Sequence, residues 1–283
     1  MCIYWTVSAS ARGFEADYRP QAAGSSPDNE AKPKPVPPGA IVLAAGNARQ
    51  FRLFSLLEAS FAVAELIYYD HPLNERIRTF LRLEHLFRQI DHFRPLSDAW
   101  SNRAAIAGLL DIISIFSRSD LKTEILKELE RHTGNLERIR RQPGVDLQTL
   151  GQVLDNLEQA IHQVYRLDGQ IGQQLRTNEF LTTIMQRSSI PGGSCNFDLP
   201  QYHYWLNQPH EVRQDQMSEW LQELHPVREA VVLLLNLVRG SSHPSQETAR
   251  KGFFQRSFDN AAPAQMIRVG LPKDASLFVE ISG

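Results

Sequence analysis

Cysteine is scarce in this sequence of 283 residues, which contains only Cys2 and Cys195. Two cysteines so far apart and in unlike surroundings form neither a disulfide framework nor a thiolate metal site, and they are typical of a reducing compartment. Long uncharged apolar runs are also lacking, because two arginines and two glutamates interrupt the most apolar stretch near the front, residues 40–69. Such charges are costly in hydrocarbon, and the first residues lack the basic start and apolar run of a signal peptide. We therefore predict a cytoplasmic protein without a membrane partner.

An excess of one charge sign is absent as well, since the formal net charge is −2 at pH 7. Hydrophobic residues make up 42% of the chain and charged residues 22%, which is the balance of a folded protein with one large domain or two modest ones. The whole molecule therefore does not attract nucleic acid by its charge, and any attraction to a charged partner has to come from a local patch.

The sequence also lacks the motifs of common catalytic and nucleotide-binding sites. It contains no His-Glu-x-x-His pair, no Walker-type glycine loop, no Gly-x-Ser-x-Gly elbow and no paired Cys-x-x-Cys knuckles. Cys195 and His203 can in principle act as nucleophile and base or as metal ligands, but an isolated spacing favours a buried thiol near a packed histidine. The two glycines of residues 190–193 lack the following Lys-Ser/Thr of a phosphate loop, which favours a tight turn. We predict a protein that is not an enzyme and holds no cofactor or metal.

Composition divides the chain into four parts. Residues 1–39 contain a proline-rich run and are predicted to be a disordered extension, because proline removes backbone donors and fixes φ. Residues 40–69 carry apolar side chains at helical spacing and are predicted to be an extra helix or a linker. Residues 70–240 are predicted to form a helical domain. Residues 241–283 are predicted to form a partial β domain, to which strands near residues 190–200 can belong.

Apolar residues recur at helical spacing throughout the predicted helical domain. The first helix is predicted to begin at Pro72, with Asp70 or His71 as its cap, since proline suits a first turn. Further helices are predicted over residues 98–116, 120–141, 146–167, 171–187, 201–206, 213–221 and 226–239. Short β-favouring runs follow at residues 253–255, 266–269 and 277–281. The predicted fold class is therefore α+β, mainly helical with a smaller sheet. Three such strands alone leave an open edge that either a partner covers or missing residues complete.

Basic side chains on the first helix indicate a binding site. Arg78 and Arg82 lie one turn apart on a face that also carries His85, and arginine grips carboxylates in a bidentate fork. A groove with such residues suits an acidic or carboxylate-ended peptide. It also suits phosphate, which leaves a nucleic-acid-binding regulator as the alternative function. The aromatic run at residues 202–205 can stack on bases, but without an RNA-binding signature core packing and partner contact are the stronger interpretation.

Four segments, in order, resemble the ZapD family of bacterial cell-division proteins. They are residues 70–84, 122–131 and 143–146, followed by the most specific one, residues 189–200 with the subsequent His203, Trp205 and Leu206. The resemblance covers residues 68–283 and implies a homodimer with an α-helical domain and a β domain. It also implies a cytoplasmic protein, gathered at the midcell division site, which binds the C-terminal peptide of the tubulin-like protein FtsZ and cross-links its filaments into bundles.

In the family that this chain resembles, a basic cleft engages the peptide, and motif positions indicate the corresponding residues here. Arg82 and His203 are the first candidates, and Arg78, Arg118 and Lys122 are the second. A two-fold dimer presents the same groove twice, so one dimer can tie two filaments together. We do not expect nucleic acid as a partner.

The chain departs from the family pattern in three places. Residues 1–65 precede the point at which family members usually begin. Family members also continue past the position of Gly283 with further strands rich in arginine, so the sheet is predicted to be truncated here. Glu179 stands where the family typically has a basic residue, on the helix before the Pro-Gly-Gly turn.

Overall fold

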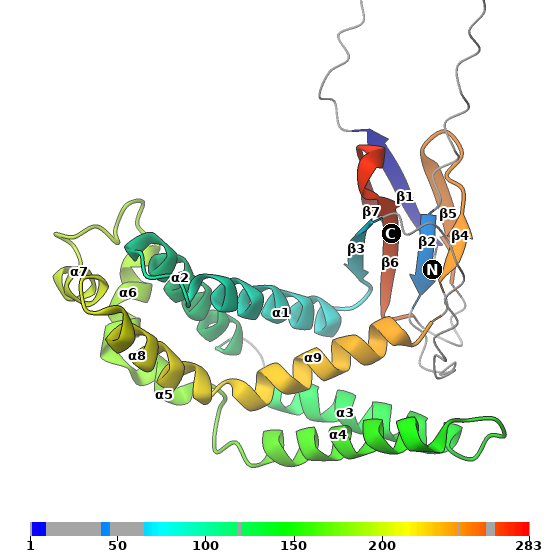
Figure 1. Cartoon of the computed structure of the whole chain (residues 1–283), viewed down its shortest axis with the longest axis horizontal. Helices are drawn as coiled ribbons and strands as arrows, with labels where there is room; N and C mark the ends of the chain where they lie inside the picture. Colours follow the sequence, from blue (N-terminus) through cyan, green and yellow to red (C-terminus); the bar gives the residue numbers. More distant parts are fainter. Residues whose placement is uncertain are drawn as a thin grey trace, which may run out of the picture.

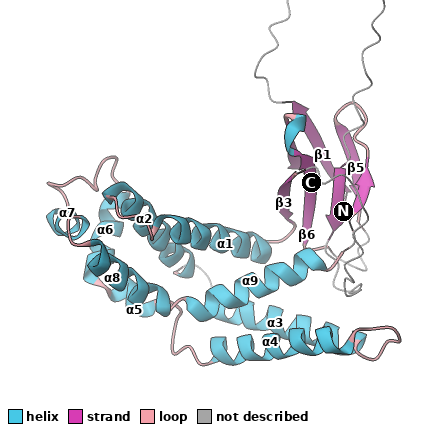
Figure 2. Ribbon diagram, in the orientation of Figure 1, coloured by secondary structure: helices cyan, strands magenta, loops and turns pink. Residues whose placement is uncertain are grey.

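The computed structural model describes residues 2–9, 41–45, 65–117, 120–242, 244–258 and 264–282. Its helices form one body, and its strands stand together at one end of that body, beside the start of α1 (Glu75–Phe93) and the end of α9 (His225–Gly240) (Figure 1 and Figure 2). The predicted α+β class, mainly helical with a smaller β region, is confirmed.

Four long helices each begin at a side chain that caps them. They are α1, α2 (Ala99–Phe116), α3 (Leu121–Ile139) and α4 (Leu147–Tyr165). The caps are Asn74, Asp98, Asp120 and Asp146, whose side chains accept hydrogen bonds from backbone N–H groups of the first turn. Such a cap satisfies donors that have no partner within the helix and is worth about 1 kcal/mol. The helices predicted over residues 98–116, 120–141 and 146–167 are confirmed.

The remaining helices are shorter, apart from α9. They are α5 (Gln173–Thr177), α6 (Glu179–Ser188), α7 (Pro200–Leu206) and α8 (His210–Gln222). The single helix predicted over residues 171–187 is divided at Asn178, because its side chain accepts a hydrogen bond from the Leu181 N–H and starts α6 anew. Helix α9, which is apolar on most sides, contacts α1, α3, α4 and the sheet and is the central helix of the body.

The apolar core has a large helical part and a small part in the sheet. Apolar residues of the long helices, such as Phe80, Leu109 and Ile125, are fully buried in the helical part. Val269 and Leu271 form the centre of the smaller part. The two parts meet at β6 (Met266–Pro272), whose first residue packs in the helical core.

The start of the first helix differs from the prediction. Asp70 and Pro72 belong to the end of strand β3 (Leu66–Pro72), and α1 begins only after its cap, Asn74. The reason is tertiary, because β3 pairs along its whole length with β6, with Asp70 opposite Arg268. Proline is tolerated there because β3 lies at the edge of its sheet, where one side of the strand needs no ladder hydrogen bonds.

The strands form two antiparallel sheets. In one sheet, β1 (Cys2–Ala9) lies between β5 (Phe253–Ser257) and β7 (Leu277–Ser282). In the other sheet, the strand order is β3, β6, β2 (Ile41–Ala45) and β4 (Ser245–Glu247). The three predicted strands are therefore confirmed as β5, β6 and β7, but they are distributed over two sheets.

Three strands come from parts of the chain for which no strand is predicted. The prediction of disorder over residues 1–39 is wrong for residues 2–9, and that of a helix or linker over residues 40–69 is wrong for the strands at residues 41–45 and 66–69. Residues 10–40 and 46–64 lie outside the described residues. A strand is stabilised by partners that can be remote in sequence, so a short run does not reveal them. β1 pairs with one edge of β5 and one edge of β7, and β2 pairs with one edge of β6. Strands from the front of the chain therefore cover edges that β5, β6 and β7 alone would expose.

A network of buried charges connects the sheet to the helices. The Arg239 guanidinium, on α9, donates two hydrogen bonds of 2.6 Å to the carboxylate of Glu84 on α1 and two, of 3.1 and 3.2 Å, to Asp70 on β3. Arg268, on β6, donates a hydrogen bond of 2.6 Å to the same Asp70. The side chains of Arg239, Asp70 and Glu84 are only 12%, 15% and 8% exposed. Four elements are thus tied together by one group of paired charges, which we call the Arg239 network.

A second buried carboxylate connects α1, α3 and the residue before β6. Glu128, whose side chain is fully buried, accepts hydrogen bonds from Arg76 on α1 at 2.6 Å and from Gln265 at 2.6 Å. It also accepts hydrogen bonds from Arg131, and it lies beside the buried His132. We call these residues the Glu128 network.

The turn between α6 and α7 depends on glycine. The N–H of Gly193 donates to the Ile190 carbonyl at 2.9 Å, and a Cβ atom at position 193 would overlap the Arg187 carbonyl oxygen. Gly192 has a φ of 73°, in the region that favours glycine. The predicted tight turn is confirmed.

Replacing Gly193 by alanine is expected to lower the free energy of unfolding by about 2 kcal/mol, because the backbone of the turn has to move away from the added methyl group. Urea denaturation measures the change. Gly134→Ala in α3 is the matched control, because a Cβ atom there meets nothing within 4 Å and alanine favours a helix. Two losses of equal size would show that the turn has no special need for glycine.

Candidate functional site

A hollow of about 570 Å³ lies where the first half of α1 meets the end of β3 and the second half of α2. Its basic side chains are Arg78, Arg82 and His85, which come from one face of α1. Leu81, Leu86 and Ile115 supply its apolar part. The face predicted from the sequence therefore lines a concave surface, which we call the arginine hollow.

The guanidinium groups of the two arginines in the hollow are available to bind an anionic ligand. Arg82 is exposed and takes part in no hydrogen bond or ion pair within the described residues. Arg78 donates to Glu75 at 3.0 Å, but the two side chains are 39% and 82% exposed. An ion pair so open to water contributes little free energy, so it competes weakly with an incoming carboxylate.

The acidic residues of the hollow only partly offset these cations. Asp70 is held by Arg239 and Arg268 behind it, so its charge is already balanced. Asp111, on α2, is exposed at the rim. Burial and the nearby positive charge of Arg78 both lower the pKa of His71, which keeps that imidazole neutral near pH 7. The hollow therefore favours an anionic group, and a carboxylate fits the fork of Arg82.

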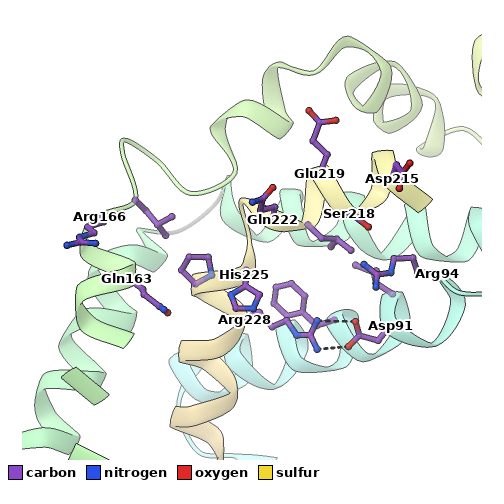
Figure 3. A pocket seen from close by; sticks show the side chains of 15 residues that line it. Asp91, Arg94, Gln163, Arg166, Asp215, Ser218, Glu219, Gln222, His225 and Arg228 are labelled. Carbon is purple, nitrogen blue, oxygen red and sulfur yellow. Dashed lines mark hydrogen bonds and ion pairs between the residues drawn. The ribbon is translucent and has the colours of Figure 1, made fainter. Parts of the chain in front are cut away.

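A larger cavity, of about 1060 Å³, lies at the junction of α1, α8, α9 and the end of α4 (Figure 3). It contains acidic side chains, Asp215 and Glu219, and basic ones, Arg94 and Arg166. Arg228 and Asp91 form an ion pair of 2.9 Å at its base. Since charges of both signs line it in similar number, this cavity has no preference for an acidic ligand. We therefore take the arginine hollow as the candidate site.

The structure brings together two of the five predicted site residues. Arg78 and Arg82 share the arginine hollow. His203 is exposed on α7, at the end of the helical body that lies away from the sheet (Figure 1). Lys122 donates hydrogen bonds of 3.1 and 2.5 Å to the carbonyls of Tyr165 and Leu167, which end α4. Arg118 lies outside the described residues.

Cys195 and His203 do not form the pair that a nucleophile and base would require. The Cys195 thiol donates to the Asp198 carboxylate at 3.1 Å, within the turn that precedes α7. The histidine instead has Asn207 as its neighbour one turn along the helix. Among the described residues, no group of three or more histidine, cysteine or acidic side chains is arranged to hold a metal.

Two arginines near the hollow were not predicted from the sequence as site residues. Arg239 and Arg268 come from α9 and β6 and meet Asp70 at its edge. The guanidinium of Arg268 also lies 4.8 Å from the ring centroid of Tyr68. Only the pairing of Asp70 with Arg268 in the sheet reveals this arrangement, and the sequence carries no local signal for it.

No helix within the described part of the chain combines the length and the apolar character that crossing a bilayer requires.

Comparison with known proteins shows extensive similarity to one family. A family model described as "ZapD: Cell division protein" matches residues 81–283. The cell division protein ZapD of Methylococcus capsulatus is 44% identical over 217 residues, which are 77% of this chain and 85% of that protein. That of Azoarcus sp. is 39% identical, over 77% of this chain and 86% of that protein. That of Nitrosomonas europaea is 36% identical, over 80% of this chain and 86% of that protein.

Proposed function

Because this chain belongs to the ZapD family of cell division proteins and so has a role in cell division, we propose that it binds the C-terminal peptide of FtsZ in the arginine hollow. We further propose that it acts as a homodimer, which cross-links FtsZ filaments into bundles at midcell in the cytoplasm. The relatives are named for a role in cell division and not for a reaction, which supports an adaptor and not an enzyme.

The observation that carries the peptide proposal is that the guanidinium of Arg82, beside Arg78, has no hydrogen-bond or ion-pair partner among the residues that the structure describes. A planar guanidinium offers two parallel N–H donors to one carboxylate, and such charge-assisted hydrogen bonds are worth about 1.5–3 kcal/mol. The apolar wall formed by Leu81, Leu86 and Ile115 can cover an adjacent side chain of the peptide. The hollow thus offers both charge and apolar contact to a short peptide.

Cross-linking requires two such hollows in one particle. A two-fold dimer carries the same hollow twice, and filaments present many copies of the peptide. Binding at one hollow therefore raises the effective concentration of filament at the other, which favours bundling even when each single contact is weak.

The test is co-sedimentation with polymerised FtsZ that has or lacks its C-terminal peptide. We expect the chain to pellet and bundle only those filaments that carry the peptide. Free tail peptide should compete, whereas a single-stranded oligonucleotide of equal charge should not. Pelleting that is independent of the tail would reject the peptide proposal. Competition by the oligonucleotide alone would favour the nucleic-acid-binding regulator.

Arg82→Glu is expected to weaken binding of the tail peptide by about 30-fold or more, because it removes the fork and places a repelling carboxylate in the hollow. Fluorescence anisotropy with a labelled tail peptide measures this change. Lys127→Glu on α3 is the matched control, since it makes the same change of charge at an exposed position that does not line the hollow. If both variants bind as the unchanged protein does, Arg82 is not part of the site.

A further inference from the structure

One wall of the arginine hollow carries a carboxylate that has no partner in the described part of the chain. Asp111, Ser114 and Ile115 lie three or four residues apart on α2, so they share the face of that helix that lines the hollow. Asp111 is exposed, and it takes part in no hydrogen bond or ion pair with any described residue. The hollow therefore combines an unpaired carboxylate on α2 with the unpaired guanidinium of Arg82 on α1.

These two charges stand on opposite walls of the hollow. Helices α1 and α2 are joined by residues 94–98 alone, so they pack as antiparallel neighbours. The Gln89 amide donates to the Ala104 carbonyl at 2.9 Å, which relates the levels of the two helices. From this bond, Arg82 lies two turns back along α1 and Asp111 two turns onward along α2. The two groups are thus at a similar level, and since no ion pair joins them, a ligand can enter between them.

The environment of Asp111 differs from that of the other acidic residue that lines the hollow. Asp70 accepts hydrogen bonds from Arg239 and Arg268, and these two cations balance its charge. No described side chain does the same for Asp111. An anionic ligand that binds Arg82 therefore approaches an unbalanced negative charge. A cationic group on the same ligand would turn this repulsion into an attraction.

We propose that Asp111 is a specificity-determining residue of the hollow and binds a lysine or arginine side chain of the FtsZ peptide while Arg82 binds a carboxylate; this inference rests on the proposed function. The volume of the hollow, about 570 Å³, is that of a site for a small ligand, so both charges come from a stretch of a few residues. The ligand class is therefore a peptide with an acidic and a basic side chain close together in sequence.

The same carboxylate acts against nucleic acid. Guanidinium groups bind phosphate as well as carboxylate, so Arg78 and Arg82 alone do not separate an acidic peptide from an oligonucleotide. The phosphates of a nucleic acid repeat along its backbone without cationic groups between them, so each one that enters the hollow is repelled by Asp111. A site rejects a competitor by such an unfavourable contact as well as by the lack of a favourable one.

Fluorescence anisotropy with two labelled peptides tests the proposal. One is the FtsZ tail peptide, and the other is the same peptide with glutamine in place of every lysine and arginine. Asp111→Asn is expected to weaken binding of the natural peptide about fivefold, the size of effect that a partly exposed ion pair supplies. A carboxylate that only repels the acidic peptide would give the opposite result, because its removal would tighten binding. Asp111→Glu keeps the charge and should stay within about twofold of the unchanged protein.

Combining the protein variant with the peptide variant isolates the proposed contact. The unchanged protein should prefer the natural peptide over the glutamine peptide about fivefold, and Asp111→Asn should lose this preference. Asp155→Asn is the matched control, because Asp155 is exposed in the middle of α4, has no described partner and lies outside the hollow. This control variant should keep the preference. Circular dichroism establishes that each variant is folded.

The outcomes separate this inference from the proposed function. Loss of the preference in Asp111→Asn, together with competition by a single-stranded oligonucleotide that the unchanged protein resists, would support both. If Arg82→Glu weakens binding of the natural peptide but Asp111→Asn leaves it unchanged or tightens it, the hollow binds the peptide and the inference is overturned. A tail peptide without lysine or arginine would overturn it in the same way. An unchanged protein that does not bind the tail peptide would reject the proposed function and the inference with it.

Discussion

Replacing Arg239 by methionine is expected to lower the free energy of unfolding by about 4 kcal/mol, because it leaves the buried Glu84 without its main counter-charge and Asp70 with Arg268 alone. Both carboxylates are less than one-fifth exposed, so water cannot replace the lost hydrogen bonds. Burial alone would raise the pKa of Glu84, but the hydrogen bonds and positive charge of Arg239, together with the charge of Arg88, outweigh burial and lower that pKa. Chemical denaturation, followed by circular dichroism, measures the loss.

The control for this variant lies on the same helix. Arg228 on α9 also pairs with a carboxylate, that of Asp91, but the two side chains are 39% and 40% exposed. Arg228→Met is therefore expected to cost no more than about 1 kcal/mol. Equal losses in the two variants would show that the Arg239 network contributes no more than an ion pair at the surface.

Glu128→Ala is expected to lower the free energy of unfolding by about 3 kcal/mol. The substitution removes the shared acceptor of Arg76, Arg131 and Gln265 from a fully buried position. The loss is smaller than for Arg239 because the two arginines are about one-third exposed and can be hydrated. Glu130→Ala, at an exposed position on the same helix, is the control and should change stability by less than about 0.5 kcal/mol.

The pH dependence provides an independent check on the Glu128 network. Burial alone would raise the pKa of Glu128, but hydrogen bonds from His132, Arg131 and Gln265 hold it well below its usual value of 4.5. Below pH 4.5 the unfolded chain therefore binds more protons than the folded one, and stability falls as the pH falls. The advantage of the unchanged protein over Glu128→Gln should be complete at pH 7 and shrink below pH 4.5. An advantage that is constant down to pH 3 would contradict this account.

Burial also lowers the pKa of His132 from 6.5, which outweighs the opposite effect of Glu128. Because the folded protein favours the neutral form of His132, protonation of this side chain also destabilises the fold, at a higher pH than protonation of Glu128 does. Stability should begin to fall as the pH drops below 6.5.

The helices could be predicted well because their signals are local. Asp98, Asp120 and Asp146 stand directly before apolar residues at helical spacing, and each side chain caps the helix that follows it. Pro72 misled the prediction, because a proline suits both a first helical turn and an edge strand. Only the pairing of β3 with β6 decides between them.

The sheets and the candidate site were predicted less completely, because their contacts join remote parts of the chain. Arg78 and Arg82 could be recognised from their helical spacing. The partners that neutralise Asp70 could not, since Arg239 and Arg268 follow it by most of the length of the chain. The hydrogen bonds of Lys122 to the end of α4 could not be predicted from the sequence either, because they depend on how two helices pack.

The place of β1 between β5 and β7 has a consequence for biosynthesis. β1 is translated before the other described strands, yet both of its neighbours in the sheet follow the described α-helices along the chain. The helices can pair early, since α1 contacts α2 and α3 contacts α4. Until β5 and β7 have been translated, β1 cannot form its sheet, and its unpaired backbone N–H and C=O groups are exposed to other nascent chains. The helical body is therefore expected to form during translation, and the sheet around β1 to close as its last step.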